Sequence, residues 1–188
     1  FECFGGLVNV AVLGPRSMEP EKAAAAAEAR LLAAHQQLSR FLPESELSHL
    51  NRDPRTRLPA DPLLLRLADA ARKAGELTAG LVDATMLGEI EAAGYRDSMQ
   101  GRLGASRPAE PAAVTPAGPS PARSWTEISV HWETGTIERP PGVAIDSGGI
   151  AKGLLADEAA ATLTDFPAYA VDCCGDARIG GTAGQRRP

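Results

Sequence analysis

Nine residues, Ile145 to Gly153, constrain the fold and the chemistry of this chain more than any other stretch. They read Ile-Asp-Ser-Gly-Gly-Ile-Ala-Lys-Gly, between a short apolar run, Val143 to Ile145, and a segment with helical spacing, Leu154 to Leu163. The pattern predicts a strand end, a glycine turn and a helix. Such a helix leaves free backbone N–H groups and a positive dipole end at the turn, and two adjacent glycines let a ligand approach the main chain.

Lys152 occupies the expected first turn of that helix, where a cation opposes the helix dipole. A bound anion would explain this lysine, and so would a tight structural turn that carries a surface lysine. Neither the G-x-x-x-x-G-K-[ST] phosphate loop nor the G-x-G-x-x-G dinucleotide fingerprint is present. The stretch alone therefore leaves an anion site and a structural turn equally open.

Composition excludes some classes of function. The 188 residues are 44% hydrophobic, as in a globular protein that buries a sizeable core. The net charge is -5 and no run of lysine or arginine forms a patch, which argues against nucleic-acid binding. No apolar run approaches the roughly 20 residues that span a bilayer. Three cysteines, two of them adjacent, form neither a disulfide framework nor a C-x-x-C site.

Periodicity and breakers predict the remaining elements. We expect strands at Phe4 to Leu13 and Ala168 to Asp172, helices at Glu19 to Leu38, Pro62 to Gly75 and Met86 to Ala93, a hairpin over Trp125 to Arg139, and a second glycine-bearing turn at Cys173 to Gly181. Ser45 is a plausible N-cap of a short helix, and Asp83 a plausible cap of the helix after it. Met99 to Ser124, rich in proline and alanine, predicts a flexible surface insertion. Periodicity alone favours Phe41 as a core residue.

Five segments contain motifs in a fixed order: Phe4-Gly5-Gly6, Phe41 to Asn51, Gly80 to Thr85, Ile145 to Gly153 and Asp172 to Gly181. In this order they resemble the ApbE family, the FAD:protein FMN transferases. The corresponding family motifs are a Met-Gly-Thr-like opening, (Y/F)-x-P-x-S-E-(L/I)-S-x-(L/I)-N, G-x-(F/V)-D-x-T, (I/V)-D-L-G-(G/A)-I-A-K-G and N-x-G-G-D-I-R-x-x-G. The departures are Ser147, Asp172, Cys174 and Ala177.

The resemblance implies an α+β fold of two subdomains, with mixed or antiparallel sheets and a ligand groove between them. It implies one such domain over residues 1–188, interrupted by the insertion at about 99–124. The implied function is a Mg²⁺-dependent transferase that cleaves FAD, attaches FMN to a threonine of a target flavoprotein and releases AMP. An FAD pyrophosphatase giving FMN and AMP, a non-catalytic FAD-binding module and an unrelated α+β scaffold remain alternatives.

The resemblance also assigns site residues. Asp146 and Lys152 are the expected catalytic residues, and the Gly149 main-chain carbonyl is an expected metal ligand. Phe41 would stack on the isoalloxazine ring, which replaces its interpretation as a core residue. The expected FAD-binding residues are Phe4, Phe41, Ser45, Asn51, Leu81, Val82, Asp83, Asp146, Lys152 and Asp176.

One family segment has no counterpart in this sequence. Relatives have a later D-A-x-x-T-A motif whose Asp and Thr bind the metal, and none occurs up to Pro188. We therefore expect a chain truncated at its C-terminus, with the remaining metal ligands beyond Pro188, or an incomplete metal site. Family members are often extracytoplasmic lipoproteins of bacteria, so a membrane-associated partner is also expected, although no signal segment is visible to fix the compartment.

Overall fold

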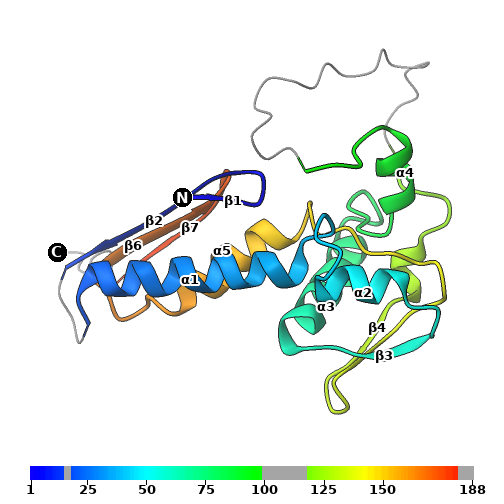
Figure 1. Ribbon diagram of the computed structural model, residues 1–188, viewed down its shortest axis with the longest axis horizontal. Helices are drawn as coiled ribbons and strands as arrows, with labels where there is room; N and C mark the ends of the chain where they lie inside the picture. The colour runs from blue at the N-terminus through cyan, green and yellow to red at the C-terminus, as the bar shows by residue number, and fades with distance from the viewer. Residues whose placement is uncertain (15–17, 99–117, 182–188) are drawn as a thin grey trace. The chain divides into compact units, whose positions relative to one another are not determined.

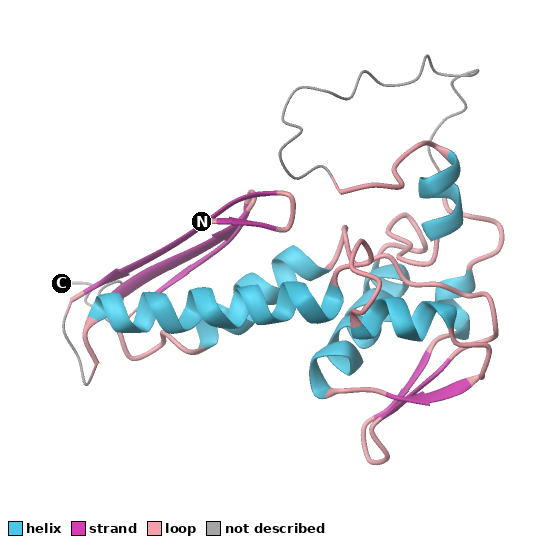
Figure 2. Ribbon diagram, viewed as in Figure 1, coloured by secondary structure: helices cyan, strands magenta, loops and turns pink. Residues whose placement is uncertain are grey.

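The computed structural model describes residues 1–14, 18–98 and 118–181 and divides into two compact units. Unit 1 comprises residues 1–36 and 151–188, and unit 2 comprises residues 37–150. Each unit combines helices with an antiparallel sheet of its own (Figures 1 and 2). The α+β class with antiparallel sheets is therefore confirmed. No helix of the described residues is long and apolar enough to cross a membrane.

Unit 1 is built on a four-stranded sheet in the order β1-β2-β6-β7. The strands are β1 (Glu2–Cys3), β2 (Gly6–Leu13), β6 (Ala168–Cys173) and β7 (Asp176–Gly180). Val8 lies opposite Cys173 and Val10 opposite Val171. Val8, Val171 and Cys173 are buried, whereas Leu7 and Leu13 are exposed, so β2 follows the period of two expected of a strand with one buried face.

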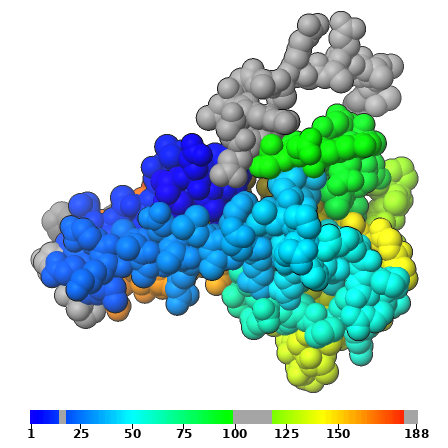
Figure 3. All heavy atoms as spheres, in the orientation of Figure 1, coloured from blue at the N-terminus to red at the C-terminus, as the bar shows by residue number. Residues whose placement is uncertain are grey.

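Two alanine-rich helices, α1 (Pro20–Leu38) and α5 (Ala151–Ala161), run alongside this sheet (Figure 1). In unit 1, α1 buries Ala23, Ala27, Leu31 and Ala34, and α5 buries Ala151, Leu155, Ala156, Ala159 and Ala160. Small side chains at these positions let the helices pack closely while alanine favours the helical state. In Figure 3 the atoms of α1, in blue, lie on the face of unit 1 toward the viewer.

Unit 2 contains a three-stranded sheet in the order β3-β5-β4, against which α3 packs. Its elements are α2 (Glu46–Arg52), β3 (Arg57–Pro59), α3 (Pro62–Leu77), α4 (Leu87–Ala92), the 3₁₀ helix η1 (Ser124–Glu127), β4 (Ser129–His131) and β5 (Thr136–Glu138). Its buried core includes Leu64, Leu67, Trp125, Ile128 and Ile137. Gly135, with φ of +62°, makes the expected turn between β4 and β5.

The expected strand at Val143 to Ile145 is wrong. The segment belongs to no sheet, because its polar backbone groups have other partners. The Asn51 side chain bonds both backbone groups of Ile145, and the Asp146 N–H donates to the Ala84 carbonyl at 2.7 Å. The apolar run is nevertheless buried at Ile145, which is 0% exposed.

Other differences come from local turns. Residues 176–180 form β7 rather than a turn, because the chain reverses within Cys174 and Gly175, both at positive φ. The short β3 is not predicted by periodicity, since three residues are too few to show a pattern. The N-cap position of α4 is Met86 rather than Asp83. Most of the expected insertion, residues 99–117, lies outside the described residues.

Two helical glycines in unit 2, Gly75 and Gly88, allow a test of how Trp125 packs against α3. A Cβ built at Gly75 in α3 would lie 2.5 Å from Cδ2 of the Trp125 indole, whereas one at Gly88 in α4 would meet nothing within 4 Å. We predict that Gly75→Ala lowers the free energy of unfolding by about 1–3 kcal/mol, since the indole must move. Gly88→Ala should be neutral or stabilising, by up to about 1 kcal/mol. Urea denaturation followed by Trp fluorescence measures both, and equal effects would contradict the packing of Trp125.

Candidate functional site

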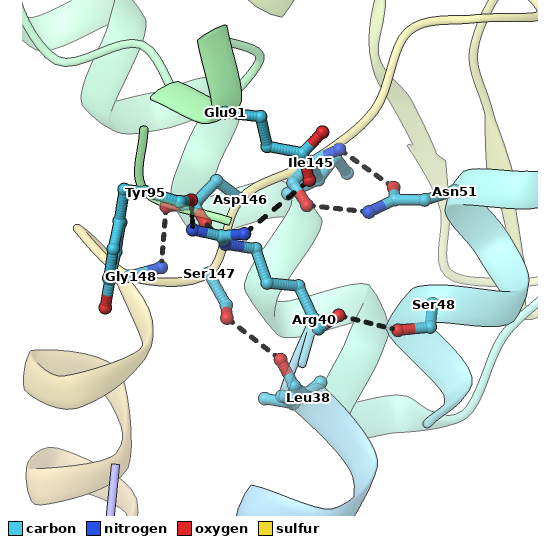
Figure 4. Close-up of polar contacts among 10 residues, drawn as sticks. All are labelled: Leu38, Arg40, Ser48, Asn51, Glu91, Tyr95, Ile145, Asp146, Ser147 and Gly148. Atoms are coloured by element: carbon cyan, nitrogen blue, oxygen red, sulfur yellow. Dashed lines mark hydrogen bonds and ion pairs between the residues drawn. The ribbon is translucent and has the colours of Figure 1, made fainter. Parts of the chain in front are cut away.

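Asp146 is held by two donors in unit 2 (Figure 4). The Arg40 Nε lies 2.7 Å from its Oδ1, and the Gly148 N–H donates to its Oδ2 at 3.0 Å. The side chains of Arg40 and Asp146 are only 5% and 10% exposed. Two buried charges so close compensate each other, and removal of either one would leave the other unpaired. Asp146 therefore has a fixed orientation in which both carboxylate oxygens already accept hydrogen bonds.

Arg40 joins Asp146 to two other segments. Its Nη2 donates to the Tyr95 carbonyl at 2.7 Å, and its Nη1 lies 3.6 Å from the Glu91 carboxylate at α4. The guanidinium carbon lies 4.1 Å from the centre of the Phe41 ring and 4.8 Å from that of the Tyr95 ring. The two rings meet edge to face with centres 5.6 Å apart. The Arg40 guanidinium and the Phe41 and Tyr95 rings thus form one cluster, which includes Phe41, the expected flavin-stacking residue.

Sequence reasoning missed Arg40, Tyr95 and Glu91 as members of this cluster. Arg40 lies in a non-periodic turn, so no pattern marks its side chain as buried. The available sequence signal for a buried Arg40 was its place in the non-helical segment Ser39 to Pro43, directly before Phe41 and among otherwise uncharged residues. Tyr95 comes from a distant segment, and only the fold brings its backbone carbonyl to Arg40.

Asn51 fixes the backbone that precedes Asp146. Its Nδ2 donates to the Ile145 carbonyl at 2.9 Å, and its Oδ1 accepts from the Ile145 N–H at 2.8 Å. On the other side, the Ser147 hydroxyl donates to the Leu38 carbonyl at 2.9 Å. The residues on either side of Asp146 are therefore tied to two different segments. The expected role of Asn51 in FAD binding stays a prediction, and its visible role is to hold this loop.

The helix that contains Asn51 is secured at both ends. Ser45 is its N-cap, as predicted, and accepts a hydrogen bond from the Ser48 N–H at 3.0 Å. At the other end, the fully buried Arg139 donates to the carbonyls of Leu50 and Asp53, the latter at 2.9 Å. Burial lowers the pKa of Arg139. Sequence reasoning missed Arg139, and it left Ser45 with an expected FAD contact that stays a prediction.

The Gly80 to Thr85 motif adjoins the same loop through the backbone bond from Asp146 to Ala84. Asp83 Oδ1 accepts from the N–H and the hydroxyl of Thr85, at 2.8 and 2.5 Å. Leu81 and Val82 are 68% and 37% exposed. Large exposed apolar side chains are available to contact a ligand, and the expected FAD contacts of Leu81 and Val82 stay predictions.

The glycine turn differs from the expectation of free N–H groups. The Gly148 N–H is occupied by Asp146, and a Cβ at Gly148 would lie 2.9 Å from Asp146 Oδ2. A Cβ at Gly149 would meet nothing within 4 Å. Both glycines are exposed, but a side chain at position 148 would displace the Asp146 carboxylate, whereas position 149 has room for one.

Unit 1 contains the Phe4-Gly5-Gly6 motif, the Asp172 to Gly181 motif and the last three residues, Ala151 to Gly153, of the glycine-turn motif. Phe4 and Gly5, both at positive φ, turn the chain between β1 and β2, and the Phe4 ring packs against His35 at 5.4 Å. A Cβ at Gly6 would lie 2.9 Å from Cys174 Sγ. Burial raises the pKa of the Cys174 thiol, and the nearby positive charge of Lys152 offsets part of this shift.

Unit 1 therefore contains Phe4, Lys152 and Asp176 among the expected site residues, and Asp176 is exposed at the start of β7. Unit 2 contains Phe41, Ser45, Asn51, Leu81, Val82, Asp83, Asp146 and Gly149. Arg40 and Asp146 are brought together with Phe41 as one cluster, whereas Ser45 supports it from the N-terminus of α2.

A complete metal site is not formed by the described residues. Across 1–14, 18–98 and 118–181, no group of three or more His, Cys, Asp or Glu side chains is arranged to hold a metal ion. The expected Gly149 carbonyl is a single ligand, and Mg²⁺ is usually bound through one or two carboxylates together with substrate phosphates. The described residues alone therefore supply at most part of a Mg²⁺ site.

Comparison with known proteins identifies the family. The model of the ApbE family matches residues 4–188. The chain belongs to the ApbE family. No curated protein sequence matches it.

Solved structures of the family share the fold. The flavin transferase ApbE of Vibrio cholerae superposes with a TM-score of 0.70 at 21% identity, over 93% of this chain and 55% of that one. The ApbE protein of Thermotoga maritima gives a TM-score of 0.73 at 23% identity, over 95% and 57% of the two chains. The apo flavinyl transferase ApbE of Pseudomonas stutzeri gives 0.73 at 18% identity, over 96% and 57%. This ApbE-family chain thus spans just over half the length of these relatives.

The Asn51 clamp on Ile145 can be tested by stability. Asn51→Ala removes both hydrogen bonds and leaves a backbone N–H and carbonyl without a partner, so we predict a loss of about 1–3 kcal/mol in the free energy of unfolding. His49→Ala, an exposed position on the same helix, is the control and should change it by less than about 0.5 kcal/mol. Denaturant unfolding measures both, and a silent Asn51→Ala would show that the loop does not depend on the clamp.

Proposed function

We propose that the intact protein is a FAD:protein FMN transferase. The observation that supports this most is the buried Arg40–Asp146 pair beside the Phe41 and Tyr95 rings. It places a fixed carboxylate and an aromatic cluster at two of the motif positions that the family resemblance assigns to FAD. Family membership over residues 4–188 supports a flavin transferase reaction.

In the proposed reaction, the hydroxyl oxygen of a threonine on the acceptor flavoprotein attacks the phosphorus on the FMN side of the FAD pyrophosphate. The bond between this phosphorus and the bridging oxygen breaks, AMP leaves with that oxygen, and the hydroxyl proton is released. The pyrophosphate gains charge as this bond breaks, so cations nearby lower the barrier. Lys152 is the proposed cation. It lies in the first turn of α5, where a positive charge opposes the helix dipole, and a bound anion would offset this cost.

Asp146 has a binding role in this proposal. Both of its oxygens are engaged, by Arg40 and by Gly148, so it acts as a fixed negative acceptor for a polar N–H or O–H group of FAD rather than as a mobile base. We include Mg²⁺ as a requirement on the family resemblance, since two phosphate groups need charge neutralisation. Gly149 would contribute its main-chain carbonyl.

A second candidate is a non-catalytic FAD-binding module. It would need only the fixed Asp146 carboxylate and the Phe41 and Tyr95 rings, and no metal ion. FAD hydrolysis to FMN and AMP is the third outcome. The acceptor protein, membrane-associated or soluble, belongs to the proposal and is not identified by the described residues.

One assay separates these outcomes. The full-length protein is incubated with FAD, Mg²⁺ and a flavoprotein that contains an acceptor threonine, and both AMP release and the acceptor mass are measured. Transfer gives AMP together with an FMN-modified acceptor. AMP without modification indicates a hydrolase, and FAD binding without AMP indicates a binding module. Absence of FAD binding at about 1 mM would contradict every flavin-based function.

Lys152→Ala tests the proposed cation. We predict that FMN transfer falls by about tenfold to a thousandfold, the loss expected when one charge-stabilising group is removed. Stability should stay unchanged or rise slightly, because a charge that opposes the dipole leaves α5. Lys22→Ala, an exposed lysine in the first turn of α1 in the same unit, is the matched control and should leave transfer intact. Full transfer in Lys152→Ala would assign the lysine to a structural turn.

A further inference from the structure

Each of the three nitrogens of the buried Arg40 guanidinium faces an oxygen of the protein. Its Nε, Nη1 and Nη2 face oxygens of Asp146, Glu91 and Tyr95 respectively, and its side chain is 5% exposed. Its own carbonyl accepts a hydrogen bond from the Ser48 hydroxyl at 3.3 Å, which fixes the turn that contains it. A buried guanidinium that faces three protein oxygens in three directions is suited to hold the neighbouring segments in place.

The group that Arg40 holds most directly is the Tyr95 segment. Tyr95 follows α4, its N–H donates to the Ile90 carbonyl at 3.1 Å, and its carbonyl accepts from Arg40 at 2.7 Å. Gly94 before it has a φ of +101°, so the chain turns sharply there. Tyr95 is 42% exposed, and its ring meets Phe41 edge to face. Arg40 therefore sets the position of an aromatic ring that still presents surface to solvent.

Isoalloxazine is a large planar ring system that binds well on aromatic surface, and a correctly placed pair of rings contributes more than a single mobile one. We propose that Arg40 is a positioning residue for flavin binding, which holds Tyr95 beside Phe41 so that both rings contact the isoalloxazine. The inference rests on the proposed function. It adds Tyr95 as a second aromatic contact, with one ring stacked on the isoalloxazine and the other against its edge. It also makes the flavin half of FAD, but not the adenosine half, depend on Arg40.

Lysine cannot replace arginine in this role. An ammonium group can stay beside Asp146, but one nitrogen does not reach three oxygens in three directions, nor does it present a flat face to two rings. Arg40→Lys thus keeps a charge for Asp146 while it releases the Tyr95 carbonyl. Tyr95→Ala keeps the backbone carbonyl for Arg40 and removes the ring alone.

The test uses FMN and AMP as separate probes of the full-length protein. We expect Arg40→Lys and Tyr95→Ala each to weaken FMN binding by about tenfold, to reduce the quenching of flavin fluorescence on binding, and to leave AMP binding within about twofold. Tyr95→Phe should bind FMN as the wild type does. Arg72→Lys, an arginine of α3 paired with Asp69 and Glu76, is the matched control and should change neither ligand.

Two results would overturn the inference while the proposed function stands. One is wild-type FMN affinity in both Arg40→Lys and Tyr95→Ala. The other is an equal loss of FMN and AMP binding in both variants, because that pattern indicates general disruption rather than positioning of the flavin half. A wild-type protein that binds neither FMN nor AMP would instead overturn the proposed function, and the inference with it.

Discussion

The buried ion pair between Arg40 and Asp146 is the interaction on which the rest of unit 2 depends. A carboxylate that is 10% exposed and a guanidinium that is 5% exposed are costly to bury unless they compensate each other, and loss of one partner typically costs about 3–5 kcal/mol. The pair therefore fixes the relative positions of the turn at Arg40, the loop at Asp146 and the Tyr95 segment after α4. Because Phe41 is the next residue after Arg40, the aromatic ring is fixed by the same interaction.

Backbone hydrogen bonding extends this arrangement. The loop before Asp146 runs through the protein without a partner strand, so its buried N–H and carbonyl groups need other partners. The Asn51 side chain bonds the N–H and the carbonyl of Ile145, and the Ala84 carbonyl accepts from the Asp146 N–H. The Ser147 hydroxyl adds a side-chain bond to the Leu38 carbonyl. Arg139 in turn binds the last carbonyls of the helix that contains Asn51. Buried backbone groups without a partner would destabilise the fold. Here their hydrogen bonds hold the loop that positions the Asp146 carboxylate.

The sequence predicted those features that repeat or that a single residue type requires. Helices α1 and α3, strands β2 and β6, the N-cap at Ser45 and the family follow from periodicity, capping and motif order. It failed where distant segments decide the outcome. The apolar run at Ile145 resembles a strand, yet a side chain 94 residues away takes both of its hydrogen bonds. Arg40 and Arg139 are buried by such contacts too, and no local pattern marks them. Metal ligation, the compartment and the partner stay predictions.

The central claim is that FAD binding depends on an Asp146 carboxylate held in one orientation, and the glycine turn offers the most direct measurement. Gly148→Ala places a Cβ 2.9 Å from Asp146 Oδ2, whereas Gly88→Ala, at an exposed position of α4, adds the same methyl group with nothing within 4 Å. FAD affinity of the full-length protein, measured by titration calorimetry, should fall by about tenfold or more in Gly148→Ala and change by less than about threefold in Gly88→Ala. Equal affinities in the two variants would contradict the claim that the held carboxylate is part of the flavin site.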